Sequence, residues 1–205
     1  CHPPKAGDGA LVMSSDFEDG TAAGWQPNEP AHWRVADDHG SQVYELTAPG
    51  TQGTVRAPTS WSVLAGSDAA SFELTGRLRC DTDPATAVRD MCVFFHFQDP
   101  THFYYVHFAG TSDAVHNIIG VVNGADRVKI NAEPPGGSVF RLTDREWHAF
   151  KVTCDVTGVI RAYIDDMATP ILTARDRALT HGLVGVGSFD DTGAFDDIVL
   201  RKIGD

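Results

Sequence analysis

Met91 to Ala109, MCVFFHFQDPTHFYYVHFA, predicts two antiparallel strands joined by a short turn. Side chains alternate between the two faces of a strand, and Asp99, Pro100 and Thr101 are residue types that favour turns. One face of the hairpin is apolar and suited to a core, with Val93, Phe95, Phe97, Tyr104, Val106 and Phe108. The other face is polar and aromatic, and a tight turn pairs Gln98 with Phe103, His96 with Tyr105, Phe94 with His107 and Cys92 with Ala109. One sheet surface is therefore expected to display two histidines and a tyrosine.

Similar short strands follow one another along the chain. Ser71 to Cys80 alternates apolar with charged side chains, and segments 147–155 and 159–164 predict a hairpin that turns at Thr157 and Gly158. Segments 116–122, 127–130, 182–189 and 195–202 have the same character, and Gly, Pro and Asp residues separate them. Helical periodicity is nearly absent. We therefore expect an all-β fold with almost no helix, a two-sheet antiparallel jelly-roll sandwich.

The composition limits the classes of partner. The chain has 205 residues, of which 42% are hydrophobic, and this suits a single domain with a sizeable core. A formal net charge of −12 argues against nucleic acid, because phosphates require a basic surface. Neither a P-loop nor a dinucleotide-binding fingerprint occurs, so nucleotide binding lacks support. No run of about 18 apolar residues predicts a transmembrane helix.

The first residues resemble those of a mature bacterial lipoprotein after removal of its signal peptide. Cys1 opens the polar, proline-containing stretch CHPPKAGDG, and in such proteins the first cysteine carries lipid. The resemblance predicts an exported protein on the periplasmic or cell-surface side, attached to the membrane through lipid on Cys1. Residues 1–12 are then a lipidated N-terminal tether and residues 13–205 a single domain. The alternative is that the sequence merely happens to start at a cysteine.

Three further cysteines, Cys80, Cys92 and Cys154, allow at most one disulfide among them. Cys80 and Cys92 flank a loop between neighbouring predicted strands, which favours their pairing. Alternation opposes it, because Cys80 falls on the core side and Cys92 on the side of His96. Either a β-bulge intervenes or Cys80 pairs with Cys154. No Cys and His spacing typical of a structural zinc site occurs.

Several motifs resemble the concanavalin A-like lectin/glucanase superfamily. They are SDFEDG at 15–20, Gly24-Trp25, WHAFKVTCD at 147–155, GVIRAYIDD at 158–166 and GLVGVGSFDDTGAFDDIVL at 182–200. The laminin-G-like and 3-keto-disaccharide hydrolase branches are the most similar, over about residues 15 to 203. The resemblance implies a two-sheet jelly roll whose concave face usually meets sugars, although one fold hosts many functions.

Acidic residues near both ends of the chain suggest a cation site. In jelly rolls of this type the first and last strands lie side by side, which would bring Asp16, Glu18 and Asp19 near Asp196 and Asp197. Clustered carboxylates suit calcium, and related sandwiches often carry a structural calcium ion there. We therefore expect these five residues as candidate calcium ligands. The alternative is that they are solvated turn residues in an acidic chain.

The polar face of the hairpin is the candidate ligand site. Its expected ligand-binding residues are His96, Gln98, Tyr105 and His107 from the hairpin, joined by Arg77, Arg79, His116, Asn117 and Lys129 from neighbouring segments. Such a locally basic face suits an anionic or hydroxyl-rich ligand, such as a uronate-bearing polysaccharide. Trp61 is a further candidate, because it follows Pro58 in a loop and could stack on a sugar or contact a protein at the rim.

The polar face carries groups that two kinds of enzyme could use, but no complete set of catalytic residues. In a polysaccharide lyase, Tyr105 or His107 would exchange a proton, and in a metal-assisted glycoside-cleaving enzyme, His96, His107 and His116 would bind a divalent ion. A glycosidase of the usual type needs two acids flanking the bond, and Glu73 is the only acid near this face. Each histidine has a plain alternative as a structural residue that satisfies neighbouring groups.

Carbohydrate recognition is the leading function that these features predict. One alternative is a non-catalytic accessory subunit on the outer side of a membrane protein complex, held by its lipid and its loops. A second is the lyase or metal-assisted enzyme just described. The first two differ in whether the concave face is filled by solvent or covered by another polypeptide.

Overall fold

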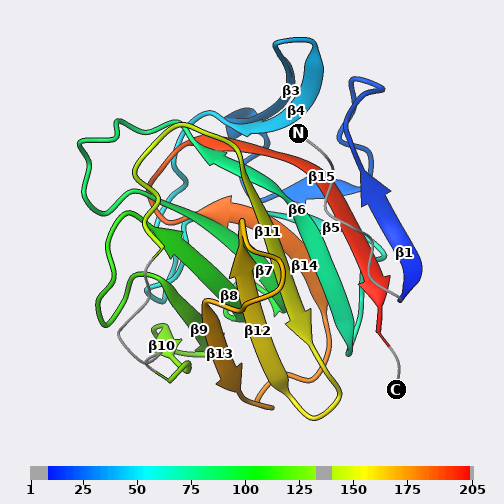
Figure 1. Ribbon diagram of the computed structural model, residues 1–205, viewed down its shortest axis with the longest axis vertical. Coiled ribbons are helices and arrows are strands. Elements are labelled where there is room, and N and C mark those ends of the chain that lie inside the picture. Colours follow the sequence, from blue (N-terminus) through cyan, green and yellow to red (C-terminus); the bar gives the residue numbers. More distant parts are fainter. Residues whose placement is uncertain (1–8, 133–139, 204–205) are drawn as a thin grey trace.

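The computed structural model describes residues 9–132 and 140–203, which form two stacked antiparallel sheets (Figure 1). The eight-stranded first sheet has the strand order β13-β12-β11-β6-β15-β4-β3, and β1 also pairs with β15. Its strands are β13 (Leu172–Arg175), β12 (Val159–Ile164), β11 (His148–Cys154), β6 (Phe72–Cys80), β15 (Gly193–Lys202), β4 (Ser41–Leu46), β3 (Trp33–Asp38) and β1 (Ala10–Ser15).

The seven-stranded second sheet has the order β10-β9-β8-β7-β14-β5-β2. Its strands are β10 (Val128–Lys129), β9 (Ile118–Asn123), β8 (His102–Ala109), β7 (Asp90–Asp99), β14 (Leu183–Ser188), β5 (Ser60–Leu64) and β2 (Trp25–Pro27). Among the described residues, the only helical segment is the 3-10 turn Pro30–His32. The predicted all-β sandwich is therefore confirmed. No helix in the described part of the chain is long and apolar enough to cross a membrane.

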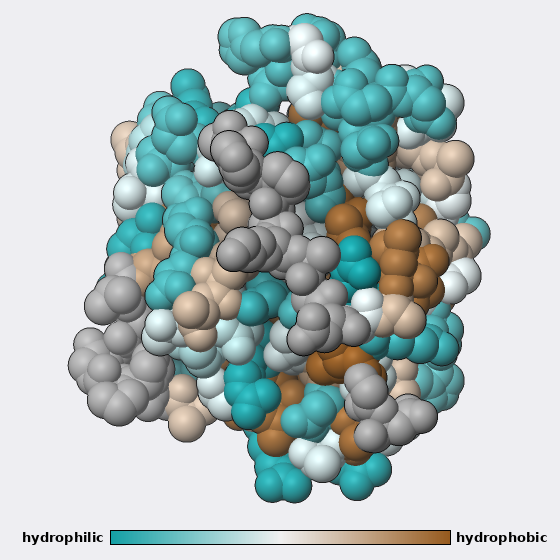
Figure 2. Space-filling view, turned by 45° about the vertical axis from the view of Figure 1, so that its right-hand side comes forward, coloured by the Kyte–Doolittle hydropathy of each residue, from teal (hydrophilic) through white to brown (hydrophobic). Residues whose placement is uncertain are grey.

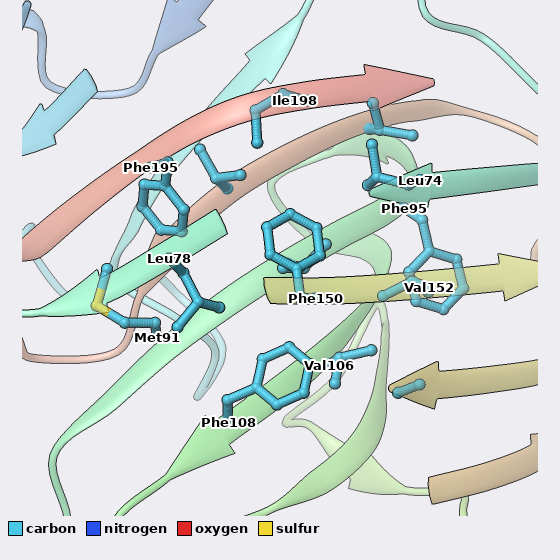
Figure 3. Close-up of a cluster of buried hydrophobic side chains, with 14 of the residues drawn as sticks. Leu74, Leu78, Met91, Phe95, Val106, Phe108, Phe150, Val152, Phe195 and Ile198 are labelled. Atoms are coloured by element: carbon cyan, nitrogen blue, oxygen red, sulfur yellow. The ribbon is translucent and has the colours of Figure 1, made fainter. Parts of the chain in front are cut away.

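The alternation seen in the sequence forms the core between the sheets. Phe72, Leu74 and Leu78 of β6 are buried on the inner face of the first sheet. Phe150 of β11 lies among these side chains and packs between the two layers (Figure 3). Strands β11 and β12 form the expected hairpin, with Phe150 opposite Ile164. β1 begins at Ala10, inside the segment expected to be a tether, and it pairs with β15 as the resemblance implied.

A β-bulge changes the register of the hairpin formed by β7 and β8. Phe95 pairs with Tyr104 and Asp99 with His102, so three residues of β7 face one residue of β8 between these pairs. Phe94 therefore pairs with Tyr105, and Cys92 with His107, two residues away from the predicted partners. The predicted pairing is wrong because it assumed an unbroken ladder. Its assignment of faces still holds outside the bulge, since two extra residues preserve the alternation.

Inside the bulge the face assignments are wrong. His96 has a positive φ of 46° and turns toward Phe72 and Tyr104, away from the predicted polar face. Phe97 moves to the outer face, where it stacks on Phe103 with ring centroids 5.3 Å apart. Gly182 fits against this bulge because a Cβ at its position would lie 2.4 Å from the His96 carbonyl carbon. The bulge is therefore held by tight backbone contact with the start of β14.

The outer face of the second sheet carries a second buried cluster. It contains Cys92, Phe94, Phe97, Phe103, Tyr105, Ile118 and Val122 from the strands, covered by Ala57 and Phe189 from loops. The middle of this sheet is thus buried on both faces. Phe94, Tyr105 and His107 of the expected polar face therefore lie inside the protein, whereas Gln98 is exposed.

The three cysteines lie on the faces that alternation predicted, and all three are free thiols. Cys80 and Cys154 belong to the core between the sheets, whereas Cys92 lies in the outer cluster. No disulfide joins any of the three. The alternation argument that separated Cys80 from Cys92 is confirmed, and the proposed pairing of Cys80 with Cys154 is not formed.

The surface offers no broad apolar face on the side seen in Figure 2, which is largely hydrophilic with small hydrophobic patches. The large apolar side chains that are exposed in the described residues come from separate parts of the chain: Leu11, Val88, Val115, Val128 and Val156. Single exposed apolar residues are ordinary on protein surfaces.

Candidate functional site

The residues predicted to share one face lie on different sides of the sandwich. Tyr105 and His107 are on the outer face of the second sheet. Lys129 shares that face, because it pairs with Gly120, which in turn pairs with Tyr105. Arg77 and Arg79 point outward from β6 in the first sheet, on the opposite side of the core. The prediction of one common basic surface is therefore wrong. The sequence could not show which sheet each strand joins.

Tyr105 and His107 have almost no accessible surface. Their exposed fractions are 0% and 2%, and the ring of Phe189 covers both with centroid distances of 5.7 and 4.9 Å. Arg127 and Arg56 lie over the same Phe189 ring, at 4.4 and 5.3 Å from its centroid. Direct stacking of a sugar on Tyr105 is therefore blocked. Their neighbour His116 packs its ring on His107 and binds Asp113 through Nδ1 at 2.8 Å.

The two arginines of β6 are held by carboxylates. Arg77 pairs with Asp196 at 2.5 Å and with Asp197 at 2.8 Å. Arg79 pairs with Asp38 and Asp81, each at 2.7 Å. Both guanidinium groups also lie over the ring of Trp147, at 5.1 and 4.9 Å. This network neutralises the positive charge that the sequence assigned to a ligand, so we assign it a structural role.

Each of the five candidate calcium ligands takes part in a hydrogen bond or an ion pair with another residue of the chain. Asp16 accepts from the Glu18 N–H, Asp19 accepts from the Thr21 N–H and hydroxyl, and Glu18 accepts from Ser41. Asp196 and Asp197 pair with Arg77, as described above. These contacts give each carboxylate a partner within the chain. The calcium site stays a prediction.

His96 lies at one end of the sandwich, beside a cavity of about 380 Å³. Its Nδ1 faces the Leu179 carbonyl at 3.1 Å and its Nε2 faces the Ala70 carbonyl at 3.2 Å. Burial lowers the pKa of His96, although the two carbonyls oppose this. Gln98, in the same bulge, is exposed and donates to the His181 carbonyl at 3.0 Å. His96 is therefore separated from His107 and His116, and the predicted three-histidine metal site is not formed.

The structure instead brings Asp90 and Cys92 to His107. His107 Nε2 lies 3.0 Å from Asp90 Oδ2, and Cys92 Sγ donates to the same oxygen at 3.3 Å. Burial opposes ionisation of Asp90, but the charge and hydrogen bond of His107 hold the pKa of this carboxyl well below its usual range. Burial and the Asp90 carboxylate raise the pKa of Cys92 well above its usual value. Cys92 is therefore a protonated thiol and a poor nucleophile.

A second carboxyl group, Asp191, adjoins this cluster and gives a test of its electrostatics. Asp191 accepts the Asp90 N–H at 2.8 Å, and burial together with the Asp90 charge raises the pKa of Asp191 from 3.8 to about 7. The unfolded chain therefore loses this proton at lower pH than the folded chain. Between about pH 4 and 7 the free energy of unfolding should fall as the pH rises.

We expect Asp191→Asn to remove that part of the pH dependence. Asparagine keeps an oxygen that can accept the Asp90 N–H but carries no charge, so the variant should gain stability over the parent as the pH rises toward 8. Urea denaturation of both proteins at several pH values between 4 and 8 measures the difference. Parallel stability curves for the two proteins would contradict the assignment.

An open pocket of about 190 Å³ lies beside Trp61 on β5. Trp61 is partly buried, and its ring contacts Phe97 with centroids 4.9 Å apart. The polar side chains that line the pocket are all hydroxyls or amides: Asn28, Thr51, Gln52, Thr54, Thr59 and Thr101. No lining residue of this pocket is charged. Trp61 therefore lies on strand β5 and not in the loop that the sequence predicted, beside a pocket whose polar groups are neutral.

Comparison with solved structures identifies the architecture. Carbohydrate binding module CBM66 from Bacillus subtilis is 15% identical, with a TM-score of 0.60 over 87% of this chain and 96% of its own. Cellulose induced protein Cip1 is 13% identical, with a TM-score of 0.61 over 94% and 98%. Lectin I-B4 from Griffonia simplicifolia is 9% identical, with a TM-score of 0.54 over 94% and 100%.

Sequence comparison adds no closer relative. No protein-family model matches the chain, and no curated protein matches it in sequence. At these identities the structural likeness shows the fold alone. The chain therefore has a two-sheet antiparallel sandwich fold similar to that of these structures.

Proposed function

We propose that this protein binds an uncharged glycan at the Trp61 pocket. The observation that carries the proposal is an aromatic ring beside a pocket lined only by neutral polar and apolar residues, in a chain with a net charge of −12. A sugar ring offers an apolar face that packs on an aromatic ring and hydroxyls that bond to amides and hydroxyls. A neutral lining favours such a ligand over a uronate, which needs a cation.

The fold supports this proposal. The similar structures include a protein described as a carbohydrate binding module and one described as a lectin. Trp61 lies on the same outer face of the second sheet as Tyr105 and His107, because it pairs with Gly187, which pairs with Cys92. It lies further along that face and takes the role that the sequence gave to Tyr105 and His107. The ligand is accordingly a neutral saccharide rather than an anionic one.

Export and attachment to a membrane are further parts of the proposal. They rest on the resemblance of the first residues to a lipoprotein, and Cys1 lies outside the described residues. A protein that recognises polysaccharides works where polysaccharides are, which agrees with a cell-surface or periplasmic place. Mass spectrometry of the N-terminal peptide from the producing cell would show a diacylglyceryl group on Cys1.

Replacing Trp61 with alanine should weaken glycan binding by about 30-fold, the effect of losing about 2 kcal/mol from a central aromatic contact. A glycan array with the parent protein first identifies a neutral ligand, and isothermal titration calorimetry then compares the variants. Trp147→Ala is the matched control, because Trp147 is also partly buried but lies with Arg77 and Arg79 on the opposite side.

The two variants separate a binding site from a general loss of structure. Trp147→Ala should keep the parental affinity, whereas Trp61→Ala should not. Equal affinity of Trp61→Ala and the parent would overturn the proposed site. A parent that binds only anionic glycans, or none on the array, would overturn the proposed function.

A further inference from the structure

We propose that Asp90, Cys92 and His107 form a binding site for a borderline transition-metal ion of the zinc class. Each offers one ligand atom, and the three atoms lie within 4.8 Å of one another. Within residues 9–132 and 140–203 no other group of three His, Cys, Asp or Glu side chains meets this condition. The site is separate from the Trp61 pocket, so the proposal does not depend on glycan binding.

The backbone places the three ligands without distortion. Asp90 and Cys92 are two residues apart on β7 and so point to the same face. His107 of β8 is the register partner of Cys92. All three belong to central strands of one sheet, which position side chains more rigidly than loops do.

The distances suit a small ion. His107 Nε2 lies 3.0 Å and Cys92 Sγ 3.3 Å from Asp90 Oδ2. Tetrahedral zinc, with bonds of about 2.0 to 2.3 Å, separates such ligand atoms by about 3.3 to 3.6 Å. Two of the three separations are therefore within a few tenths of an ångström of those that zinc requires, and the third, from His107 Nε2 to Cys92 Sγ, is within 4.8 Å.

The surrounding groups orient the ligands as an outer shell does in known metal sites. His107 Nδ1 lies 2.9 Å from the Val115 carbonyl, so it carries the proton and leaves Nε2 free to coordinate. The Ser188 hydroxyl donates to Asp90 Oδ1 at 3.0 Å, and the Phe189 N–H donates to Oδ2 at 3.1 Å. Both ends of the carboxylate are therefore held in place.

Tyr105, two residues before His107 on the same face of β8, carries a buried hydroxyl that lacks a hydrogen-bond partner among the described residues. The exposed fraction of Tyr105 is 0%, and its ring packs near that of His107. Asp90 and Cys92 are 1% and 0% exposed. Unsatisfied buried polar groups are rare and call for an explanation, of which an ion with its water is one.

The donor set selects the kind of metal. One thiolate, one imidazole and one carboxylate suit zinc or cobalt, whereas calcium and magnesium prefer oxygen ligands alone. The thiolate and the carboxylate together balance the two charges of a divalent ion, and binding releases the thiol proton to solvent. The bound ion would tie β7 to β8 beneath Phe189, which is a structural role.

Cobalt provides the decisive probe, because thiolate coordination gives a charge-transfer band in the near ultraviolet. The full chain is unfolded in denaturant and stripped of metal with a chelator that is then removed. It is refolded with increasing amounts of Co²⁺, up to and beyond one equivalent, and then titrated with Zn²⁺. We expect the band to appear in the parent, to saturate at one equivalent and to vanish as zinc replaces cobalt. Zinc should also raise the melting temperature of the parent.

Cys92→Ser is the main variant and Cys154→Ser its matched control, since Cys154 is another buried free cysteine outside the cluster. Cys92→Ser should lose the band, and Cys154→Ser should keep it. Circular dichroism verifies that each variant is folded, and His107→Gln should lose the band as well if it folds. A parent without the band, or a band that survives in Cys92→Ser, would overturn the proposal.

Discussion

Replacing Asp90 with alanine should lower the free energy of unfolding by about 3 to 5 kcal/mol in metal-free protein at neutral pH. The size follows from the buried donors that lose their acceptor, since each such group costs about 1 to 3 kcal/mol. Asp90 is 1% exposed and faces His107 at 3.0 Å, and it also accepts hydrogen bonds from Ser188 and Phe189. The variant leaves these donors without an acceptor in the interior. Urea denaturation with a chelator present measures the change.

Asp99→Ala is the matched control for that measurement. Asp99 is also a carboxylate of β7 paired with a histidine of β8, His102, at 2.9 Å, but their exposed fractions are 49% and 36%. Exposed pairs of this kind contribute about 1 kcal/mol or less, so the control should lose far less stability than Asp90→Ala. Losses of equal size in the two variants would show that the burial of the Asp90 pair is unimportant.

Phe150→Ala should also lower the free energy of unfolding by about 3 to 5 kcal/mol, but through loss of core packing. Phe150 is fully buried between the sheets, and its ring lies over Gly76, where a Cβ would come within 2.8 Å of it. Figure 3 shows Phe150 surrounded by Leu78, Val152 and Ile198. Truncation leaves a cavity that the rigid β6 and β11 backbones cannot fill.

Val128→Ala provides the comparison for the core truncation, because Val128 is 58% exposed at the end of β10. It should change the free energy of unfolding by about 0.5 kcal/mol or less. Thermal and urea unfolding of both variants give the values. A small effect of Phe150→Ala would mean that the two layers repack easily around the missing ring.

Alternation predicted strands of the first sheet such as β6 and β12 well, because these strands bury mainly one face. The short strand β13 was not assigned. Segment 159–164 coincides with β12, and Ser71 to Cys80 matches β6 within one residue. The strands before residue 65 were not assigned, since the pattern there is less regular. β3, for example, includes two adjacent aspartates, and β2 ends at a proline.

The candidate sites were harder to predict because they depend on neighbours in space. The two extra residues of the β7 bulge placed Cys92, rather than Phe94, opposite His107 and so created the Asp90, Cys92 and His107 cluster. The positive φ at His96 gives no pattern in the sequence that alternation can detect. The pairing of Arg77 with Asp196 joins residues 119 positions apart, which no local pattern reveals.

The trio of Asp90, Cys92 and His107 could have been found from one clue. An aspartate and a cysteine at positions i and i+2 of a strand, next to a strand with a histidine, already share a face. Testing registers shifted by two residues would have aligned all three. Searches for metal sites that rely on spacing along one segment miss ligands contributed across a β-ladder.

Burial of the second sheet on both faces has a consequence for the way the protein opens. The backbone amides of β7 and β8 are shielded by the core on one side and by Ala57 and Phe189 on the other. They should be the last to exchange with deuterium, at a rate set by global unfolding, while those of the short edge strands β2 and β10 exchange through local fraying. The hairpin at the centre of this chain is thus its slowest-exchanging unit.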